Sequence, residues 1–198
     1  MAIRRAAELR ERILDGMRRL LAERRFDELN VADVLTEAKV SRASFYFYFP
    51  SKQAVLADLV RAAVGEGHGA AAPFVDPDGE GLRAGIRDGA RLWRENAGVL
   101  TAVVDAWATD DDLRALWLAQ MDTFTDAAAA RIAADPRALA YLGDRDVRAV
   151  AAGLTWTGER LYYLAASGVP PFDDEQVLID VLTHAWTSIL YGESGGVR

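Results

Sequence analysis

Residues 41–52 read SRASFYFYFPSK, and this stretch decides the fold of the N-terminal part of the chain. Ser41 is a favoured N-cap residue, because its hydroxyl can accept from the free amides at the start of a helix. Pro50 cannot continue a helix, since its ring removes the backbone donor. The sequence therefore predicts a short helix over 42–48 that carries most of an unbroken aromatic run, Phe45 to Phe49.

The aromatic run cannot be buried as a whole. A helix completes a turn in about 3.6 residues, so Phe45 and Phe49 share one face with Val40. The remaining rings point away from that face: Tyr46, Phe47 and Tyr48. Exposed rings in such number are costly unless a partner covers them. We expect Phe45 and Phe49 to be structural and the other three to meet a partner outside the protein.

A second short helix precedes this one. Asn30 is a good N-cap, and the carboxylate of Asp33, three residues on, can accept from the Asn30 backbone amide in return. A helix is therefore predicted over 31–38. Two helices of about two turns each, joined by three or four residues, form a helix-turn-helix. A longer helix over 7–24 is expected to precede the pair and complete a homeodomain-like three-helix unit, and a fourth helix is expected to begin at Lys52 and run to about residue 64.

The predicted recognition helix offers side chains suited to DNA. Its exposed start carries Arg42, which can pair with guanine, and Ala43, which can touch a thymine methyl; Ser44 follows them. A tyrosine ring can pack on a sugar while its hydroxyl donates to a phosphate. Lys52 lies in the first turn of the next helix, where free amides and the positive end of the helix dipole also favour a phosphate.

The rest of the chain is helical by pattern. Apolar residues recur at spacings of three and four, and no window alternates with period two, so the expected fold class is all-α with about nine helices. The glycine-, proline- and acid-rich segment 65–81 predicts a loop or a loosely helical connector. We place a helix-turn-helix domain at 1–52, a connecting helix at 52–65, and a second helical domain at 53–198. Its expected helices are 82–96, 98–108, 110–134, 144–167 and 174–191, with N-caps at Thr109 or Asp110, at Asp144 and at Asp173.

Charge is distributed unevenly along the chain. The whole sequence has 23 Lys/Arg and 30 Asp/Glu, a net charge of −7. Residues 1–52 hold 11 basic and 8 acidic residues, hence +3, whereas residues 53–198 hold 12 and 22, hence −10. A basic end on an acidic body would be held in one orientation on a polyanion. Solvated helix surfaces of random sign explain a difference of this size equally well.

Composition narrows the class of protein. No stretch has the length and apolarity needed to cross a bilayer, and Met1 to Leu20 lacks the apolar centre of a secretory signal, so we expect a cytoplasmic protein. The absence of cysteine excludes disulfides and thiolate metal sites. His68 and His184 show no ligand spacing, and no phosphate-binding glycine loop or nucleophile elbow occurs. An enzyme on a helical scaffold is therefore disfavoured, and no cofactor or metal is expected.

The segment 26–59, FDELNVADVLTEAKVSRASFYFYFPSKQAVLADL, resembles the DNA-binding domain of the TetR family of bacterial regulators. The signature of that family is a valine-serine turn, an aromatic-rich short helix and a following lysine, and these fall here at matching offsets without gaps. The resemblance implies a homodimeric transcription regulator, usually a repressor. It also implies base and phosphate contacts by Arg42, Ala43, Ser44, Tyr46, Phe47, Tyr48 and Lys52.

One residue departs from that resemblance. Lys39 stands in the turn where the family usually has glycine, and a positive φ is strained for lysine. We expect either a local cost of about 1 kcal/mol or a slightly different turn. Lys39 could add a phosphate contact or be a plain solvated lysine.

All five tryptophans lie in the second domain. One face of its long central helix carries large side chains at spacings of four and three: Trp117, Met121 and Phe124. Such a stripe serves equally as core or as the wall of an elongated apolar cavity, with Thr155 or Tyr162 as a polar handle.

The chain resembles the branch of the family related to the mycobacterial ethionamide-resistance repressor in three segments: SFYFYFPSK at 44–52, GERLYYLA at 158–165 and HAWTSILYGE at 184–193. That branch holds apolar ligands in an aromatic channel. The resemblance implies that a small apolar effector binds here. Gly89 and Gly158 stand where that relative has larger or polar residues, so the shape of the channel is expected to differ. By position, the resemblance implies a lining of Trp93, Trp117, Met121, Phe124, Thr155 and Trp186.

The last two helices each show a broad apolar face. We expect these faces to pair with a second copy, which would place two recognition helices about one DNA turn, roughly 34–36 Å, apart on a palindromic site. The alternative is that they complete the core of a single chain. The residues concerned are Val147, Val150, Ala151, Leu154 and Leu161 on one helix and Val177, Leu178, Val181, Leu182, Ala185 and Ile189 on the other.

The predicted function is that of a ligand-responsive DNA-binding regulator. It would bind a palindromic operator in double-stranded DNA as a homodimer and be released by the effector. The alternative is a helical sensor, adaptor or small-molecule-binding protein that does not bind DNA.

Overall fold

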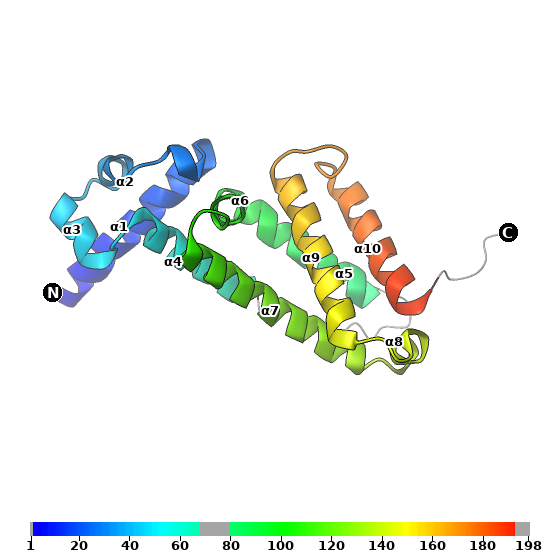
Figure 1. Cartoon of the computed structure of the whole chain (residues 1–198). Helices are drawn as coiled ribbons and strands as arrows, with labels where there is room; N and C mark the ends of the chain where they lie inside the picture. The colour runs from blue at the N-terminus through cyan, green and yellow to red at the C-terminus, as the bar shows by residue number, and fades with distance from the viewer. Residues whose placement is uncertain (1, 68–79, 193–198) are drawn as a thin grey trace. The chain divides into compact units, whose positions relative to one another are not determined.

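The computed structural model describes residues 2–67 and 80–192, and every regular element within these ranges is helical (Figure 1). The prediction of an all-α fold is therefore confirmed. None of the helices in these ranges has the length and apolarity that a membrane span requires. The elements are α1 (Ala2–Glu23), the 3-10 helix η1 (Phe26–Glu28), α2 (Val31–Ala38), α3 (Arg42–Tyr48), α4 (Lys52–Gly67), α5 (Glu80–Glu95), α6 (Ala97–Ala106), α7 (Asp111–Ala133), α8 (Pro136–Leu142), α9 (Val147–Ala166) and α10 (Glu175–Tyr191).

The chain divides into two compact units. The first comprises Met1–Glu66 and Asn96–Trp117, and the second comprises Gly67–Glu95 and Leu118–Arg198. In the first unit, α1 packs against α2, α3 and α6. Gly16 permits the close crossing of α1 and α2, because a Cβ at this position would lie 3.1 Å from the Cβ of Ala38. The side chains at the centre of this unit are fully buried: Ile13, Met17, Val34, Phe45, Val55, Leu56 and Val60.

The helix-turn-helix has the boundaries that the sequence predicts. Helix α2 covers Val31–Ala38, and its N-cap Asn30 forms the expected capping box with Asp33. The Asn30 amide donates to Asp33 Oδ2 at 2.8 Å, and the Asp33 amide donates to Asn30 Oδ1 at 3.1 Å. Helix α3 covers Arg42–Tyr48, and its start is capped by Ser41. Local capping signals therefore define both helices.

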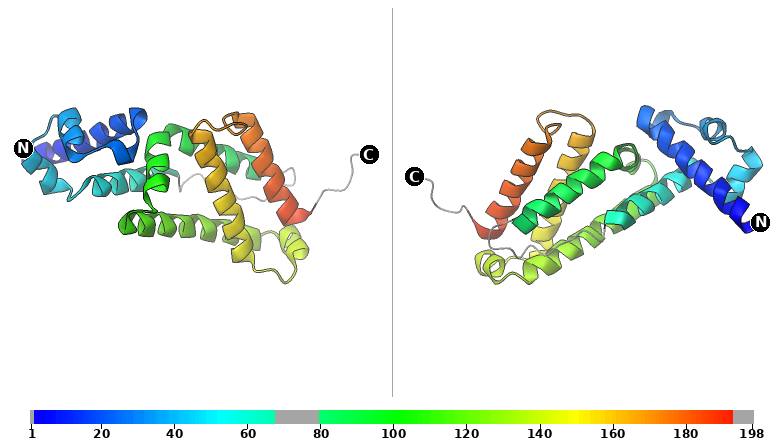
Figure 2. Two further views of the ribbon diagram at one scale, coloured as in Figure 1. Left: turned by 45° about the horizontal axis from the view of Figure 1, so that its top comes forward. Right: turned by 180° about the vertical axis from the view of Figure 1, so that it is seen from behind.

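The second unit is built around α10, which packs against α5, α8 and α9; Figure 2 shows α9 and α10 running side by side. Four residues that we assigned to a dimer interface lie in the core of this unit, so that assignment is wrong for them: Ala151, Leu154, Leu178 and Leu182. Val147, Val150 and Leu161 are partly buried against the same core. Val181 and Ile189 remain exposed. Most of the apolar residues on these faces of α9 and α10 therefore pack within the single chain.

Several predicted boundaries are corrected. Helix α8 was not predicted, although Asp135 caps it and Pro136 opens it. The N-cap of α9 is Asp146 and not Asp144, and the N-cap of α10 is Asp174 and not Asp173. Helix α1 begins at Ala2 and not near residue 7. Most of the predicted connector 65–81, with His68, lies outside the described residues.

A buried carboxylate ties the end of α10 to the start of α8. Asp135 accepts a hydrogen bond from Tyr191 Oη at 2.7 Å and from the backbone amides of Arg137 and Ala138 at 2.9 and 3.4 Å. Burial opposes the ionisation of Asp135, but these donors outweigh it and hold the pKa of its carboxyl below the ordinary value. Burial and the same hydrogen bond raise the pKa of Tyr191 to about 12.

Tyr191→Phe should lower the free energy of unfolding by about 1.5 kcal/mol at neutral pH, because it removes a hydrogen bond to a charged acceptor. A depressed folded pKa contributes stability that is present above the unfolded pKa of about 3.9 and is lost as pH falls through the folded value. The difference between wild type and variant should therefore shrink below about pH 4. Urea denaturation across this range measures it, and a difference independent of pH would contradict the ionised pairing.

Candidate nucleic-acid interface

Helix α3 has one buried and one exposed face. Phe45 is completely buried and Phe49 is 3% exposed, and their ring centroids lie 6.3 Å apart. The Ser41 hydroxyl accepts from the Ser44 amide at 3.1 Å, and the two serine hydroxyls are hydrogen-bonded at 2.9 Å. The buried rings and the cap fix the helix on its unit, as predicted for Phe45 and Phe49.

The opposite face of α3 carries the predicted contact residues. Phe47 is 78% exposed and Tyr46 is 47% exposed, which is unusual for aromatic side chains of this size. Tyr48 is half-buried, and its ring meets that of Phe47 edge to face with centroids 4.9 Å apart. Arg42 and Ala43 are exposed at the start of the helix, and Ser44 is half-buried. The structure therefore places six of the predicted contact residues on one short helix, whereas Lys39 lies in the turn before it and Lys52 begins the helix after it.

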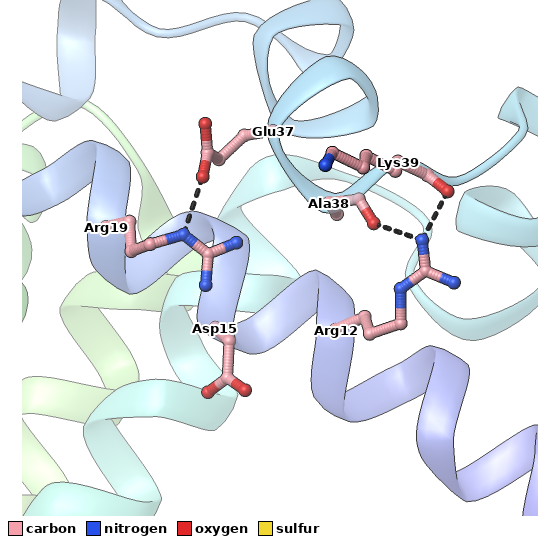
Figure 3. Close-up of a pocket in the computed structure, with 6 residues that line it drawn as sticks. All are labelled: Arg12, Asp15, Arg19, Glu37, Ala38 and Lys39. Carbon is pink, nitrogen blue, oxygen red and sulfur yellow. Dashed lines mark hydrogen bonds and ion pairs between the residues drawn. The ribbon is translucent and has the colours of Figure 1, made fainter.

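Lys39 occupies the turn in a left-handed conformation, with φ 54° and ψ 48°. It is the only residue other than glycine with a positive φ among the residues described. The strained turn that the sequence predicted is therefore present. The Lys39 side chain is exposed, beside a shallow cavity of about 180 Å³ between α1 and the end of α2 (Figure 3).

Lys39→Gly should raise the free energy of unfolding by about 1 kcal/mol, because glycine adopts this conformation without a Cβ clash. The greater freedom of glycine in the unfolded chain offsets part of a larger relief of strain. Urea denaturation monitored by circular dichroism measures the change. Lys39→Ala is the control and should have little effect, since alanine keeps the Cβ. A loss of stability on introducing glycine would contradict the left-handed turn.

Lys52 is engaged within the protein. Its ammonium donates to the carbonyl oxygen of Phe26 at 2.8 Å and to that of Leu29 at 2.5 Å, and it lies 4.4 Å from the centroid of the Phe26 ring. Desolvation lowers the pKa of Lys52, although the nearby carboxylates of Asp27 and Asp33 act in the opposite direction. Two of its three donors are thus used by backbone carbonyls.

The residues predicted to line a ligand channel are mostly core residues. Trp93, Met121 and Trp186 are buried in the second unit, and Trp117 is buried in the first. Phe124 is half-buried, as is Thr155, whose hydroxyl donates to the carbonyl of Ala151 in its own helix at 2.8 Å. The four buried side chains of this set are apolar, which suits either a tight core or an apolar site.

Tyr162 fills the space over the two glycines that we associated with the channel. A Cβ on Gly89 would lie 2.6 Å from Tyr162 Oη, and a Cβ on Gly158 would lie 3.6 Å from Tyr162 Cε2. The Tyr162 hydroxyl donates to the carbonyl of Ile86 at 3.0 Å, and its ring stacks on Trp93 with centroids 6.4 Å apart. Burial raises the pKa of Tyr162. Its donor is therefore used within the chain.

A helix-turn-helix with a fixed buried face and an exposed face of arginine and aromatic side chains defines the class of a DNA-binding transcription regulator. Two family models match the chain. Residues 13–59 match "Bacterial regulatory proteins, tetR family", and residues 82–192 match "Transcriptional regulator EthR, C-terminal domain". The chain therefore belongs to the TetR family of bacterial transcriptional regulators.

Individual relatives agree with this assignment. The HTH-type transcriptional regulator EthR of Mycobacterium tuberculosis is 30% identical over 187 residues, which cover 92% of this chain and 87% of that protein. A transcriptional regulator from Rhodococcus sp. Rha1 has a similar fold, with a TM-score of 0.70 at 17% identity over 90% of this chain and 96% of that one. FadR of Thermus thermophilus, a TetR-family repressor solved with lauroyl-CoA, gives a TM-score of 0.61 at 22% identity over 96% and 97%. These relatives are regulators and not enzymes.

Proposed function

We propose that this chain is a repressor that binds a palindromic operator as a homodimer and is released by a small apolar effector. The observation that carries the DNA-binding half of the proposal is the exposure of Phe47, 78%, on a helix whose opposite face is completely buried. An exposed aromatic face of this kind marks a site where a partner binds. Residues 1–52 would read DNA, the helix beginning at Lys52 would connect, and residues 53–198 would hold the effector and the second copy.

The proposed DNA contacts follow from the positions on α3. Arg42 would read a base edge, and Ala43 and Ser44 would lie against the groove beside it. The aromatic face of Tyr46, Phe47 and Tyr48 would pack on sugar and phosphate. Lys39, at the exposed turn, would add a charge near the phosphate backbone. A protein of this kind acts on the chromosome, so we place it in the cytoplasm.

The test of DNA binding is the retardation of the intergenic fragment upstream of the gene that encodes this chain. Affinity should fall steeply as salt rises, because phosphate contacts release counterions. An unrelated fragment of equal length is the control, and it should bind more weakly at every salt concentration. Binding that does not distinguish the two fragments, or no binding at low salt, would favour the sensor or adaptor instead.

A homodimer is the assembly that a palindromic operator requires. Val181 is 41% exposed and Ile189 is 46% exposed on α10, and they are the large apolar side chains that this helix leaves outside the core of the chain. A second copy that covered them would bury an otherwise exposed patch. Sedimentation velocity should give twice the mass of 21.6 kDa, and a monomer at micromolar concentration would contradict the assembly.

The effector half of the proposal rests on the aromatic, largely enclosed second unit. The Thermus relative holds an acyl-CoA, so lauroyl-CoA and dodecanoic acid are suitable first probes of a long apolar ligand. A bound apolar compound should quench tryptophan fluorescence and weaken DNA binding in the same concentration range. A ligand shifts the equilibrium only by its difference in affinity between the two states. Compounds that bind without changing DNA affinity would contradict control by this route.

A further inference from the structure

The C-terminal end of α2 is held by an arginine of α1. Arg12 Nη2 donates to the carbonyl oxygen of Ala38 at 2.7 Å and to that of Lys39 at 2.5 Å, as Figure 3 shows. The last carbonyls of a helix have no partner within the helix and need a donor from elsewhere. Arg12 supplies that donor at the left-handed residue from which the chain turns toward α3. The turn is thereby tied to α1.

The N-terminal approach to α2 is held by the lysine of α4. The Lys52 ammonium binds the carbonyls of Phe26 and Leu29, which belong to η1 and to the residue just after it. Only Asn30 separates Leu29 from the first residue of α2. The ammonium lies over the Phe26 ring, and desolvation lowers the pKa of Lys52, as expected of a group drawn into the protein. Each end of α2 therefore has a cation on backbone oxygens.

Arg24 also donates to a backbone carbonyl, that of Glu28 at 2.9 Å, but it pairs with Asp33 as well, and the remaining cations of the domain differ from Arg12 and Lys52. Among residues 7–52, five arginines pair with carboxylates, chiefly on exposed surface: Arg10, Arg18, Arg19, Arg24 and Arg25. Exposed pairs of this kind are weak and can exchange partners with a phosphate. Within the same range, the side chains of Lys39 and Arg42 have no hydrogen bond or ion pair to the protein. Free charge is thus available at the turn and at the start of α3.

We infer that Arg12 and Lys52 are positioning residues, which hold the two ends of α2 and so fix the orientation of α3, and that Lys52 does not serve as a phosphate contact. The inference rests on the proposed DNA-binding function. Helix α2 has 8 residues and α3 has 7, and helices so short are not stable alone. Their placement therefore depends on such tertiary contacts. The exposed cation Lys39 remains to meet a phosphate, and Arg42 remains free to meet a base edge.

Salt dependence separates the two roles. Removing a phosphate contact lowers the slope of log affinity against log salt by about 0.9, whereas removing a positioning group lowers affinity without changing the slope. Lys52→Met and Arg12→Met should each bind the operator fragment about tenfold more weakly at every salt concentration, with the wild-type slope. The matched reference is Lys39→Ala, which removes the proposed phosphate contact and whose slope should fall. A slope that falls as much for Lys52→Met, or an unchanged affinity, would overturn the inference.

Hydrogen exchange of the DNA-free protein tests the positioning without the proposed function. Amides in the last turn of α2 should exchange about tenfold faster in Arg12→Met, and amides around Leu29 should do so in Lys52→Met. The conservative variants Arg12→Lys and Lys52→Arg keep a cationic donor and should restore protection. Wild-type exchange rates in both methionine variants would overturn the inference whatever the DNA result. A wild-type protein that binds no DNA would count against the proposed function alone. If a methionine variant does not fold, the conservative variant decides: unfolding or unprotected α2 amides there would also overturn the inference.

Discussion

Phe45→Ala is expected to lower the free energy of unfolding by about 3–5 kcal/mol, the usual cost of removing a fully enclosed aromatic ring. The Phe45 side chain has no exposed surface and contacts the rings of Tyr46 and Phe49. Alanine would leave a cavity where α3 meets its unit. Urea denaturation of the variant, followed by circular dichroism, measures the loss.

The matched control lies two residues further along α3. Phe47→Ala removes an identical ring that is 78% exposed, so the free energy of unfolding should stay within about 0.5 kcal/mol of the wild type. Equal losses for the two variants would contradict the assignment of one buried and one exposed face. If the assignment holds, Phe47→Ala is also a folded protein in which the DNA-facing role of the ring can be measured alone.

Arg42→Ala is expected to weaken binding to the operator by about 1–3 kcal/mol, or roughly 5- to 150-fold, because it removes a hydrogen-bonded pairing with one base. Arg42 is exposed at the start of α3, where a recognition helix meets base edges. Without a bidentate pairing, the preference at one base position should also relax. Competition binding with fragments changed at single positions measures both effects.

Lys39→Ala is the control for sequence preference. A lysine that contacts phosphate contributes to affinity for every sequence alike, so its removal should weaken binding uniformly. A variant of Arg42 that also loses affinity uniformly, with the base preference intact, would contradict the reading role of Arg42 while leaving it as a phosphate contact.

The helix-turn-helix could be predicted to the residue because its signals are local. Asn30 and Ser41 accept from amides only three residues further on, and these contacts require no other part of the fold. The alternation of buried and exposed rings along α3 also follows from helix geometry alone. Helix α8 escaped prediction because it is 7 residues long, too short for a periodic pattern to stand out beside Pro136.

The roles of Arg12 and Lys52 could not be predicted in this way. Their carbonyl partners lie 26 and 27 residues away for Arg12, and 26 and 23 residues away for Lys52, so the contacts exist only once the helices pack. The predicted end of α2 near Ala38 was the available signal for Arg12, since the last carbonyls of any helix need a donor from elsewhere. That signal indicated a need but not which side chain would meet it.

In the second unit, the sequence could not predict which apolar residues of α9 and α10 are buried. Apolar residues on α9 and α10 outnumber what one neighbour can cover, and the sequence alone did not separate the inner from the outer stripe. The structure places Leu154 and Leu182 in the core and leaves Val181 and Ile189 outside. Burial within one chain depends on which helices surround α10, and that is a property of the tertiary fold.

Selection of binding sites from a pool of genomic fragments at low salt tests the central claim most directly, because it requires no knowledge of the operator. The wild-type protein should enrich one two-fold symmetric sequence, and Phe47→Ala, folded to the same stability, should recover that sequence with clearly lower affinity. If the wild type enriches no sequence, or if Phe47→Ala enriches the same sequence with unchanged affinity, the exposed face of α3 does not read DNA.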